Sequence, residues 1–354
     1  MQKKHFIASL LVLCTLLSFT GCSGKKDNYQ RVYNVDKTDM SREQTYLDEL
    51  KKIKPEGNAV YSPTSTRTAL QMTSYITTND KVISDINAII GNTDFMSYKS
   101  TKATKFVNRV WVNKKVDIKI PSELDEYIYK MDMSDSVKAT KEKDDFVKDN
   151  TNGFLDGTPS QLGEDTIYDV MNITYFKDIW AEEGGYRLEY NNPLIFNNPD
   201  GTKKEVDTFY ASVDDAFEND TCFIVSLDYK NGNIFNLIYP KDNINDVNLA
   251  NLKKMNIDWA ELYIPEFETR NEFDLTSYFP VDMDSALTQI TRIKVDHEGT
   301  EAVAVTENNN GTGFEMSEGE VKILTLRFDV PFYYYIEDTR NNDIIFVGRV
   351  VSFE

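Results

Sequence analysis

The sequence predicts an α+β domain built on large β-sheets. Patterns typical of helices lie early in the chain, whereas the later hydrophobic runs are rich in β-branched and aromatic residues, as strands are. The hydrophobic fraction of 40% and the aromatic fraction of 12% argue against general disorder. A chain of 354 residues is also long enough to bury a large core.

Two helices are predicted near the start. Ser41-Arg42-Glu43-Gln44 has the spacing of a capping box and predicts a helix to about Lys52. Ser62-Pro63-Thr64-Ser65 begins a second helix, because Ala69, Met72 and Tyr75 follow at helical spacing.

Strands are predicted for most of the remaining chain. Residues 106–112 predict a strand and 118–121 a loop, and Asn198-Pro199-Asp200-Gly201 predicts a hairpin turn. Further strands are predicted at 170–176, 222–225, 234–239, 260–264, 321–328, 332–336 and 344–352.

Charge and histidine content exclude several classes of function. The chain has 39 Lys and Arg against 58 Asp and Glu, a net charge of −19, which disfavours a nucleic-acid partner. With only His5 and His297, most histidine-dependent catalytic and metal sites are excluded, and we expect no metal. A hydrolase with paired carboxylates remains an alternative, although no pair stands out at a defined site.

The N-terminus predicts export and lipid anchoring. Lys3 and Lys4 precede an apolar run at 6–19, and Phe19-Thr20-Gly21-Cys22-Ser23 resembles a bacterial lipobox. We expect residues 1–21 to be a lipoprotein signal peptide, 22–40 a polar tether and 41–354 one domain. Cleavage removes two lysines and no acidic residue, so the net charge becomes −21.

Lipidation of Cys22 is expected to anchor the protein to the bacterial cell envelope. Ser23 favours the outer membrane, with the protein periplasmic or exposed at the surface. An ordinary signal peptide with a chance cysteine is the alternative. Cys14 would be removed, so the unpaired Cys222 is predicted to be a buried, inert thiol and no disulfide is expected.

Five further segments occur in the order found in one protein family. They are Asn58–Ser65 (NAVYSPTS), Val107–Val112 (VNRVWV), Val170–Lys177 (VMNITYFK) followed by Trp180, Glu298–Ala304 (EGTEAVA) and Phe328–Ile336 (FDVPFYYYI). From Asn58 to its end the chain therefore resembles the serpins. The resemblance implies a single serpin-like domain with a large central β-sheet, further sheets, flanking helices and an exposed reactive-centre loop at about 298–320.

The resemblance also implies a protease inhibitor that acts as a suicide substrate and not as an enzyme. A serine or cysteine protease would cut the loop, and the freed hinge would insert into the central sheet as a strand. The hinge would comprise Glu298, Gly299, Thr300, Glu301, Ala302, Val303 and Ala304. The cluster that opens the sheet would comprise Ser62, Ser65, Asn172, Trp180 and Gln289, with Gln289 in place of the family's usual histidine. The resemblance implies no cofactor, and we expect a monomer.

The hinge sequence permits insertion. Alternate side chains of an inserted strand face the core. One set is uncharged, whereas the other contains both Glu301 and Glu307. The uncharged set comprises Thr300, Ala302, Ala304, Thr306, Asn308, Asn310 and Thr312.

The loop also predicts the class of target protease. Candidates around the scissile bond are Gly313, Phe314, Glu315, Met316 and Ser317. Because the chain has no Lys or Arg from Val295 to Val321, we expect a protease with an apolar primary pocket.

A non-inhibitory serpin-fold surface lipoprotein that binds a partner is the rival interpretation. It is favoured by Gln289, by the Asn-rich loop and by the short segments at 90–106 and 275–289, where peripheral helices should be missing.

Overall fold

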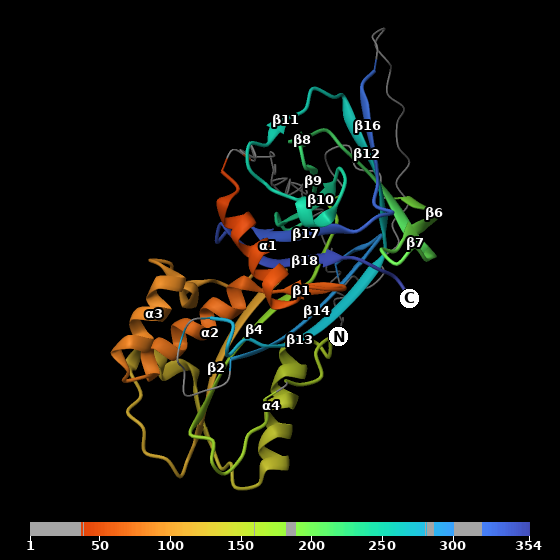
Figure 1. Cartoon of the computed structure of the whole chain (residues 1–354). Coiled ribbons are helices and arrows are strands. Elements are labelled where there is room, and N and C mark those ends of the chain that lie inside the picture. Colours follow the sequence, from red (N-terminus) through yellow and green to blue (C-terminus); the bar gives the residue numbers. More distant parts are fainter. Residues whose placement is uncertain are drawn as a thin grey trace, which may run out of the picture. The chain divides into compact units, whose positions relative to one another are not determined.

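The computed structural model describes residues 37, 39–158, 160–181, 189–279, 281, 287–300 and 321–354, with only the backbone described at 189–191. Residues 37–354 form one compact unit of helices and several β-sheets, so the predicted α+β class is confirmed (Figure 1). The unit begins earlier than expected. Lys37 and Met40, assigned above to the polar tether, are both buried in it.

Helices in the described residues are concentrated before residue 151. The α-helices are α1 (Ser41–Ile53), α2 (Pro63–Ile76), α3 (Asp80–Ile90) and α4 (Ser136–Asn150). Short 3-10 helices lie at Phe95–Ser97, Ser122–Tyr127 and Ile244–Asp246. The predictions of α1 and α2 are confirmed, whereas α3 and α4 were not predicted. As expected from its length, the segment 90–106 carries only one 3-10 turn between α3 and the next strand.

The two predicted helix starts differ in outcome. Ser62 caps α2, because its side-chain oxygen accepts a hydrogen bond from the Ser65 N–H group. The capping box predicted for α1 is wrong. Met40 is the N-cap and makes no side-chain capping bond, while Gln44 Oε1 accepts the Leu249 N–H group at 2.8 Å. Gln44 therefore ties α1 to a distant loop.

The largest sheet has seven strands. Their order is β1-β18-β17-β10-β9-β8-β11. Their bounds are β1 Ala59–Tyr61, β8 Ala216–Glu218, β9 Cys222–Asp228, β10 Ile234–Pro240, β11 Lys253–Lys254, β17 Phe332–Asp338 and β18 Asp343–Val350. Residues of α1, α2 and α3 pack with residues of these strands in one apolar cluster, which buries Leu47, Leu70, Ile86 and Tyr333.

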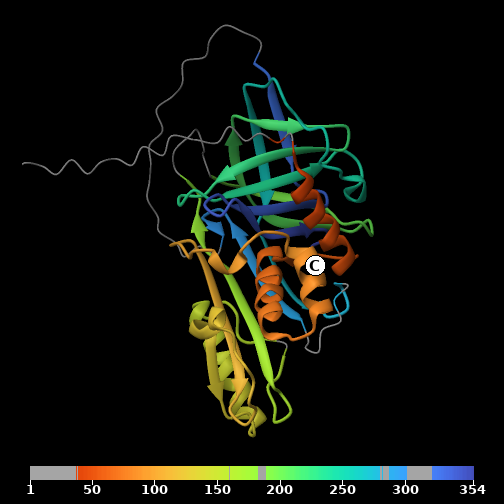
Figure 2. The same ribbon diagram turned by 90° about the vertical axis from the view of Figure 1, so that its left-hand side faces the viewer.

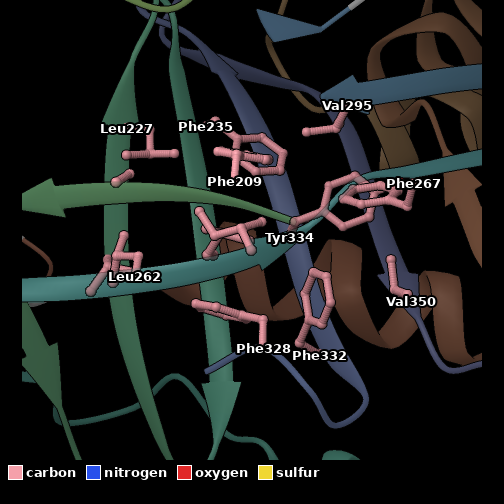
Figure 3. Packing of buried hydrophobic residues seen from close by; sticks show 14 of the residues in the cluster. Phe209, Leu227, Phe235, Leu262, Phe267, Val295, Phe328, Phe332, Tyr334 and Val350 are labelled. Carbon is pink, nitrogen blue, oxygen red and sulfur yellow. The ribbon is translucent and has the colours of Figure 1, made fainter. Parts of the chain in front are cut away.

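A four-stranded sheet supplies the opposite side of the main core. Its order is β16-β12-β7-β6, with β6 at Glu189–Asn197, β7 at Lys203–Val213, β12 at Trp259–Pro265 and β16 at Ile323–Arg327. The hairpin turn predicted at residues 198–201 joins β6 to β7. Phe235 and Tyr334 of the large sheet share one buried cluster with Phe209 and Leu262 of this sheet (Figure 3).

Two smaller sheets complete the unit. One has the order β3-β2-β4, with β2 at Thr104–Asn113, β3 at Ile128–Met131 and β4 at Tyr168–Phe176. The other has the order β13-β14-β15-β5, with β5 at Asp178–Ile179, β13 at Phe267–Asp274, β14 at Thr288–Asp296 and β15 at Gly299–Thr300. Long β2 and β4 run together past α2, with α4 beside their far ends (Figure 2). Among the described residues, no helix is long and apolar enough to span a membrane.

Candidate functional site

The candidate functional site is a gap between β4 and β14. Strand β4 pairs with β2 along one edge, and β14 pairs with β13 along one edge. In the described part of the chain, no strand pairs with the facing edges of Tyr168–Phe176 and of residues 288–294. A cavity of about 40 Å³ lies there and is lined by both strands, by α2 and by α4. Two edges of backbone N–H and C=O groups are therefore left available for a further strand.

The first residues of the predicted hinge turn into the end of this gap that lies beside β5. The Asp296 carboxylate accepts the Glu298 N–H group at 3.0 Å and the Gly299 N–H group at 3.2 Å, which stabilises a tight turn after β14. Gly299 and Thr300 then form β15, which pairs with β14 on one side and with β5 on the other. The first two residues after the turn thus occupy the position of a new strand.

Thr300 is the first side chain of β15 to point into the core. It is 1% exposed, and its Oγ1 lies 2.5 Å from the hydroxyl of buried Tyr229. Burial raises the pKa of the Tyr229 hydroxyl well above its usual value. A charged side chain at position 300 would therefore displace a buried hydroxyl that contacts Tyr229, at a position directly opposite the buried Asp178 of β5.

Trp180 stabilises the turn after β14 through two hydrogen bonds. Its Nε1–H donates to the Asp296 carbonyl oxygen at 3.0 Å, and its backbone N–H donates to the Glu298 carbonyl oxygen at 3.2 Å. The indole ring stacks on Tyr229 with a centroid distance of 4.6 Å. Trp180 thus contacts the hinge and does not join the other four residues of the predicted sheet-opening cluster.

Those four residues are brought together at the lower part of the gap. The Gln289 side chain on β14 accepts the Ser62 N–H group at 3.0 Å and donates to the Ser62 carbonyl oxygen at 2.9 Å. It also donates to Thr66 Oγ1 at 2.9 Å. The Ser65 hydroxyl donates to the Asn172 carbonyl oxygen on β4 at 3.3 Å. The start of α2 therefore links the two edges through hydrogen bonds between uncharged groups.

Helix α4 and the segment after it also contact both edges. The buried Lys143 ammonium lies 2.8 Å from Asp169 Oδ2 on β4 and donates to Ser160. On the other edge, the Arg292 guanidinium on β14 donates to the Phe154 carbonyl oxygen at 2.9 Å. A strand that enters the gap must pass beneath this connection or displace it.

Several predicted residues lie outside the described residues. These are Cys22, Glu301, Ala302, Val303, Ala304, Gly313, Phe314, Glu315, Met316 and Ser317. Conversely, the sequence interpretation missed Tyr229, Asp296 and Lys143. The spacing of Asp296 to Gly299 is a turn signal that could have been recognised. Tyr229 and Lys143 carry no such local signal.

The structure also gives the surroundings of Cys222 and His297. Cys222 is fully buried, and burial raises the pKa of its thiol, consistent with the predicted inert role. His297 Nδ1 lies 2.6 Å from Glu266 Oε1. Within the described ranges, no three His, Cys, Asp or Glu side chains are grouped so as to hold a metal ion.

Comparison with known proteins agrees with this architecture. The family model described as "Serpin (serine protease inhibitor)" matches residues 44–283 and 283–353. An uncharacterized serpin-like protein of Thermococcus kodakarensis is 23% identical, over 97% of this chain and 98% of that protein. The crystal structure of a thermophilic serpin, tengpin, in the native state superposes with a TM-score of 0.68 at 18% identity, covering 91% of this chain and 96% of that one.

Other curated relatives match over a shorter range. An uncharacterized serpin-like protein of Methanosarcina mazei is 27% identical over 54% of this chain, and corticosteroid-binding globulin of Bos taurus is 24% identical over 62%. In these two alignments the chain spans 51% and 61% of the relative's own length.

Proposed function

This chain belongs to the serpin family, and on that premise we propose that it inhibits a serine or cysteine protease as a suicide substrate. The observation that carries the proposal is the gap between β4 and β14, into which β15 has already turned. A sheet with two unpaired inner edges gains hydrogen bonds and buried apolar area when a strand is added. Cleavage of the loop would free that strand.

In the proposed reaction, the protease serine or cysteine attacks a loop peptide bond and forms an acyl-enzyme. The peptide nitrogen leaves as a new amino end, and the loop segment that is now joined to the protease by an ester or thioester bond enters the gap below Thr300. The protease is carried with it and distorted before water can release the acyl group. The inhibitor supplies a peptide bond and the free energy of strand insertion.

The core-facing sides of the two edges support the predicted insertion pattern. Thr291, Ile293 and Val295 are buried on β14, and Phe176 is buried on β4. An inserted Ala304 would face this interior, whereas the neighbouring Val303 would face the opposite side.

Paired substitutions test insertion directly. Ala304→Glu should turn the protein from inhibitor into substrate, because a carboxylate forced into the core delays insertion and leaves time for deacylation. Val303→Glu adds the same charge on the opposite face, where the register places it beside the Arg292 guanidinium, and is the matched control. Both variants are incubated with chymotrypsin, and the fraction recovered as an SDS-stable complex is measured. Equal complex yields from the two variants would contradict insertion in this pattern.

The loop supports a protease with an apolar primary pocket. Phe314-Glu315 and Met316-Ser317 are the proposed scissile bonds, and the segment from Val295 to Val321 contains no Lys or Arg. A trypsin-like pocket would leave its own carboxylate unpaired on this loop. Chymotrypsin-, elastase- or subtilisin-like enzymes should be trapped, and mass spectrometry of the released peptide should place the cut within Thr312–Ser317. Efficient trapping of trypsin would refute this assignment.

A non-inhibitory binding role is the second candidate. It is favoured by the similarity to corticosteroid-binding globulin, a relative whose name describes ligand binding. The thermal transition distinguishes the two roles. Cleavage of an inhibitor should raise the unfolding temperature strongly, because the added strand completes the sheet, whereas a pure binder should show an unchanged transition and no complex.

A further inference from the structure

Strand β15 defines the register in which the chain enters the gap. Thr300 lies opposite Val295 on β14 and opposite Asp178 on β5, and Gly299 lies opposite Asp296 and Ile179. Strands β4 and β5 form one edge, because the Lys177 N–H group between them donates to the Ala103 carbonyl oxygen at 2.8 Å and so continues the ladder with β2. Each further residue of an inserted strand therefore advances one position along both edges.

This register places Glu301 between two lysines. The position after Thr300 is opposite Lys177 on one edge and Lys294 on the other. Thr300 and Val295 point into the core, being 1% and 0% exposed, so the next position on each strand points outward. Residues directly opposite each other in neighbouring strands have Cβ atoms about 4.5–5.5 Å apart. A glutamate at this place can reach both ammonium groups.

The next positions on this face, where Tyr175 and Ile173 are buried, contain no comparable pair of cations. Val303 would lie between Tyr175 and Arg292, and Arg292 already makes a 2.5 Å ion pair with Glu268. Val305 would lie between Ile173 and Ile290. Shifting the strand by two residues would therefore take Glu301 away from both lysines, and a shift by one would turn its side chain toward the core.

We propose that Lys177 and Lys294 are positioning residues that hold the Glu301 carboxylate and fix the register of the inserted strand, whose source is the segment 301–313 of this chain. The inference rests on the proposed function. Lys294 lies 3.2 Å from Asp296 Oδ2, the carboxylate that also stabilises the hinge turn, so the turn and the cation are already coupled. Two cations on facing edges repel each other, and a carboxylate between them removes that repulsion.

A charge swap tests the proposal. The variants are Glu301→Lys, the double variant Lys177→Glu/Lys294→Glu, and the triple variant that combines all three changes. Glu301→Lys and the double variant should each raise the number of inhibitor molecules consumed per protease trapped by about tenfold, and the triple variant should recover most of this loss. Lys203→Glu/Lys204→Glu, at exposed positions of β7, makes the same change in net charge as the double variant and is its control.

A second measurement reports the register itself. Val305→Cys/Ile290→Cys should form a disulfide under oxidation only after loop cleavage, and should do so less completely when Lys177→Glu/Lys294→Glu is added. Failure of the triple variant to recover inhibition, or full disulfide formation with the lysines reversed, would overturn the proposal. If the unmodified protein neither gains heat resistance on cleavage nor traps protease, the proposed function itself fails. A normal unmodified protein with unaffected lysine variants rejects only the register inference.

Discussion

At Gly299, the residue that starts β15, an added Cβ atom would lie 2.2 Å from the Asp178 carbonyl oxygen and 2.7 Å from the Ile179 Cα atom. The backbone φ of +153° is also one that side chains with a Cβ atom rarely adopt. Glycine is therefore needed here for close approach between the hinge and β5. A larger residue at position 299 would force the hinge away from the edge of β5.

We predict that Gly299→Ala lowers the free energy of unfolding by more than about 1 kcal/mol, because backbone atoms must move to relieve the clash. It should also lower the fraction of cleaved protein that traps the protease and raise the fraction released as cleaved substrate. The reason is that β15 would no longer start the inserted strand at its position beside β5. Gly163→Ala is the control, because the nearest atom to its added Cβ lies 3.9 Å away. Urea unfolding and complex yield are measured for both, and equal losses would contradict the role of close approach.

Lys37 marks the beginning of the compact unit and is buried between strands and α1. Its ammonium donates to Asn236 Oδ1 and to the Tyr335 hydroxyl, each at 3.0 Å. Burial lowers the pKa of this ammonium from 10.5 to about 8, although Glu337 and Glu43 act to raise it. Between these two values the unfolded chain binds more protons than the folded one at this site.

Folding stability should therefore rise with pH from about 8 to 10.5 because of Lys37, by up to about 1.4 kcal/mol per pH unit. Below pH 8 the side chain is protonated in both states and adds no slope. Lys37→Met should remove this rise, whereas Lys52→Met, at an exposed position, should retain it. Urea unfolding of the three proteins between pH 7 and 10 measures the difference in slope, and parallel curves would show that Lys37 is not the source.

Among the elements, α4 shows how a mostly polar helix can be fixed over a sheet. Only Ala139, Lys143 and Val147 are buried along it, one residue per turn. The side chain of Lys143 is 1% exposed and that of its partner Asp169 17% exposed. Removing the ammonium leaves a partly buried carboxylate without its counter-charge, which costs far more than breaking a surface pair.

Lys143→Met is predicted to lower the free energy of unfolding by about 3 kcal/mol. The matched control is Lys141→Met in the same helix, because its partner Asp145 is also well exposed and such a pair contributes at most about 1 kcal/mol. With one contact to β4 lost, α4 should also obstruct strand entry less, so that cleaved Lys143→Met protein gains heat resistance faster. Chemical unfolding and a time course of thermal transitions after cleavage check both effects. Similar losses in the two variants would show that burial does not strengthen the pair.

Elements were predictable where their residues form a nearly continuous apolar or aromatic run. Strands β4 and β17 are runs of β-branched and aromatic residues, and both were predicted. Strand β14 was missed because its core face includes Gln289 and Thr291 while its outer face carries charged side chains, so no apolar alternation marks it. Helix α4 was missed because its three buried positions include a lysine, and the contact that makes this tolerable lies on another element.

At the scale of the whole molecule, some residues of the candidate site were predictable from the sequence and others were not. Ser62, Ser65, Asn172 and Gln289 could be assembled from a family resemblance, since the first three lie within its motifs and Gln289 lies ten residues before Gly299. Tyr229 and Thr300 are 71 residues apart and meet only in the folded chain, where Tyr229 bridges to Trp180 just after β5 and β5 pairs with β15. Contacts of this kind follow from topology and have no local signature.

Membrane association of the whole molecule is predicted to depend on Cys22. We expect the protein to carry lipid at this residue and to sediment with membranes, because two acyl chains are enough for stable anchoring. Cys22→Ala should abolish labelling by a fatty-acid probe and release the protein or block its processing. Cys14→Ala, within the expected signal peptide, should leave labelling unchanged. A wild-type protein found only in soluble fractions without label would contradict the anchor.

The unpaired edges of β4 and β14 also set up a competition between molecules. Any extended peptide could pair with them, including the loop of a neighbouring copy. The molecule's own segment is covalently joined to β15 and thus has an effective concentration of the order of mM, so neighbours in dilute solution cannot displace it. On a crowded membrane surface, where local concentrations approach that value, this advantage shrinks. If Cys22 is lipidated as predicted, a low surface density of the protein is then a condition for each copy to insert its own strand.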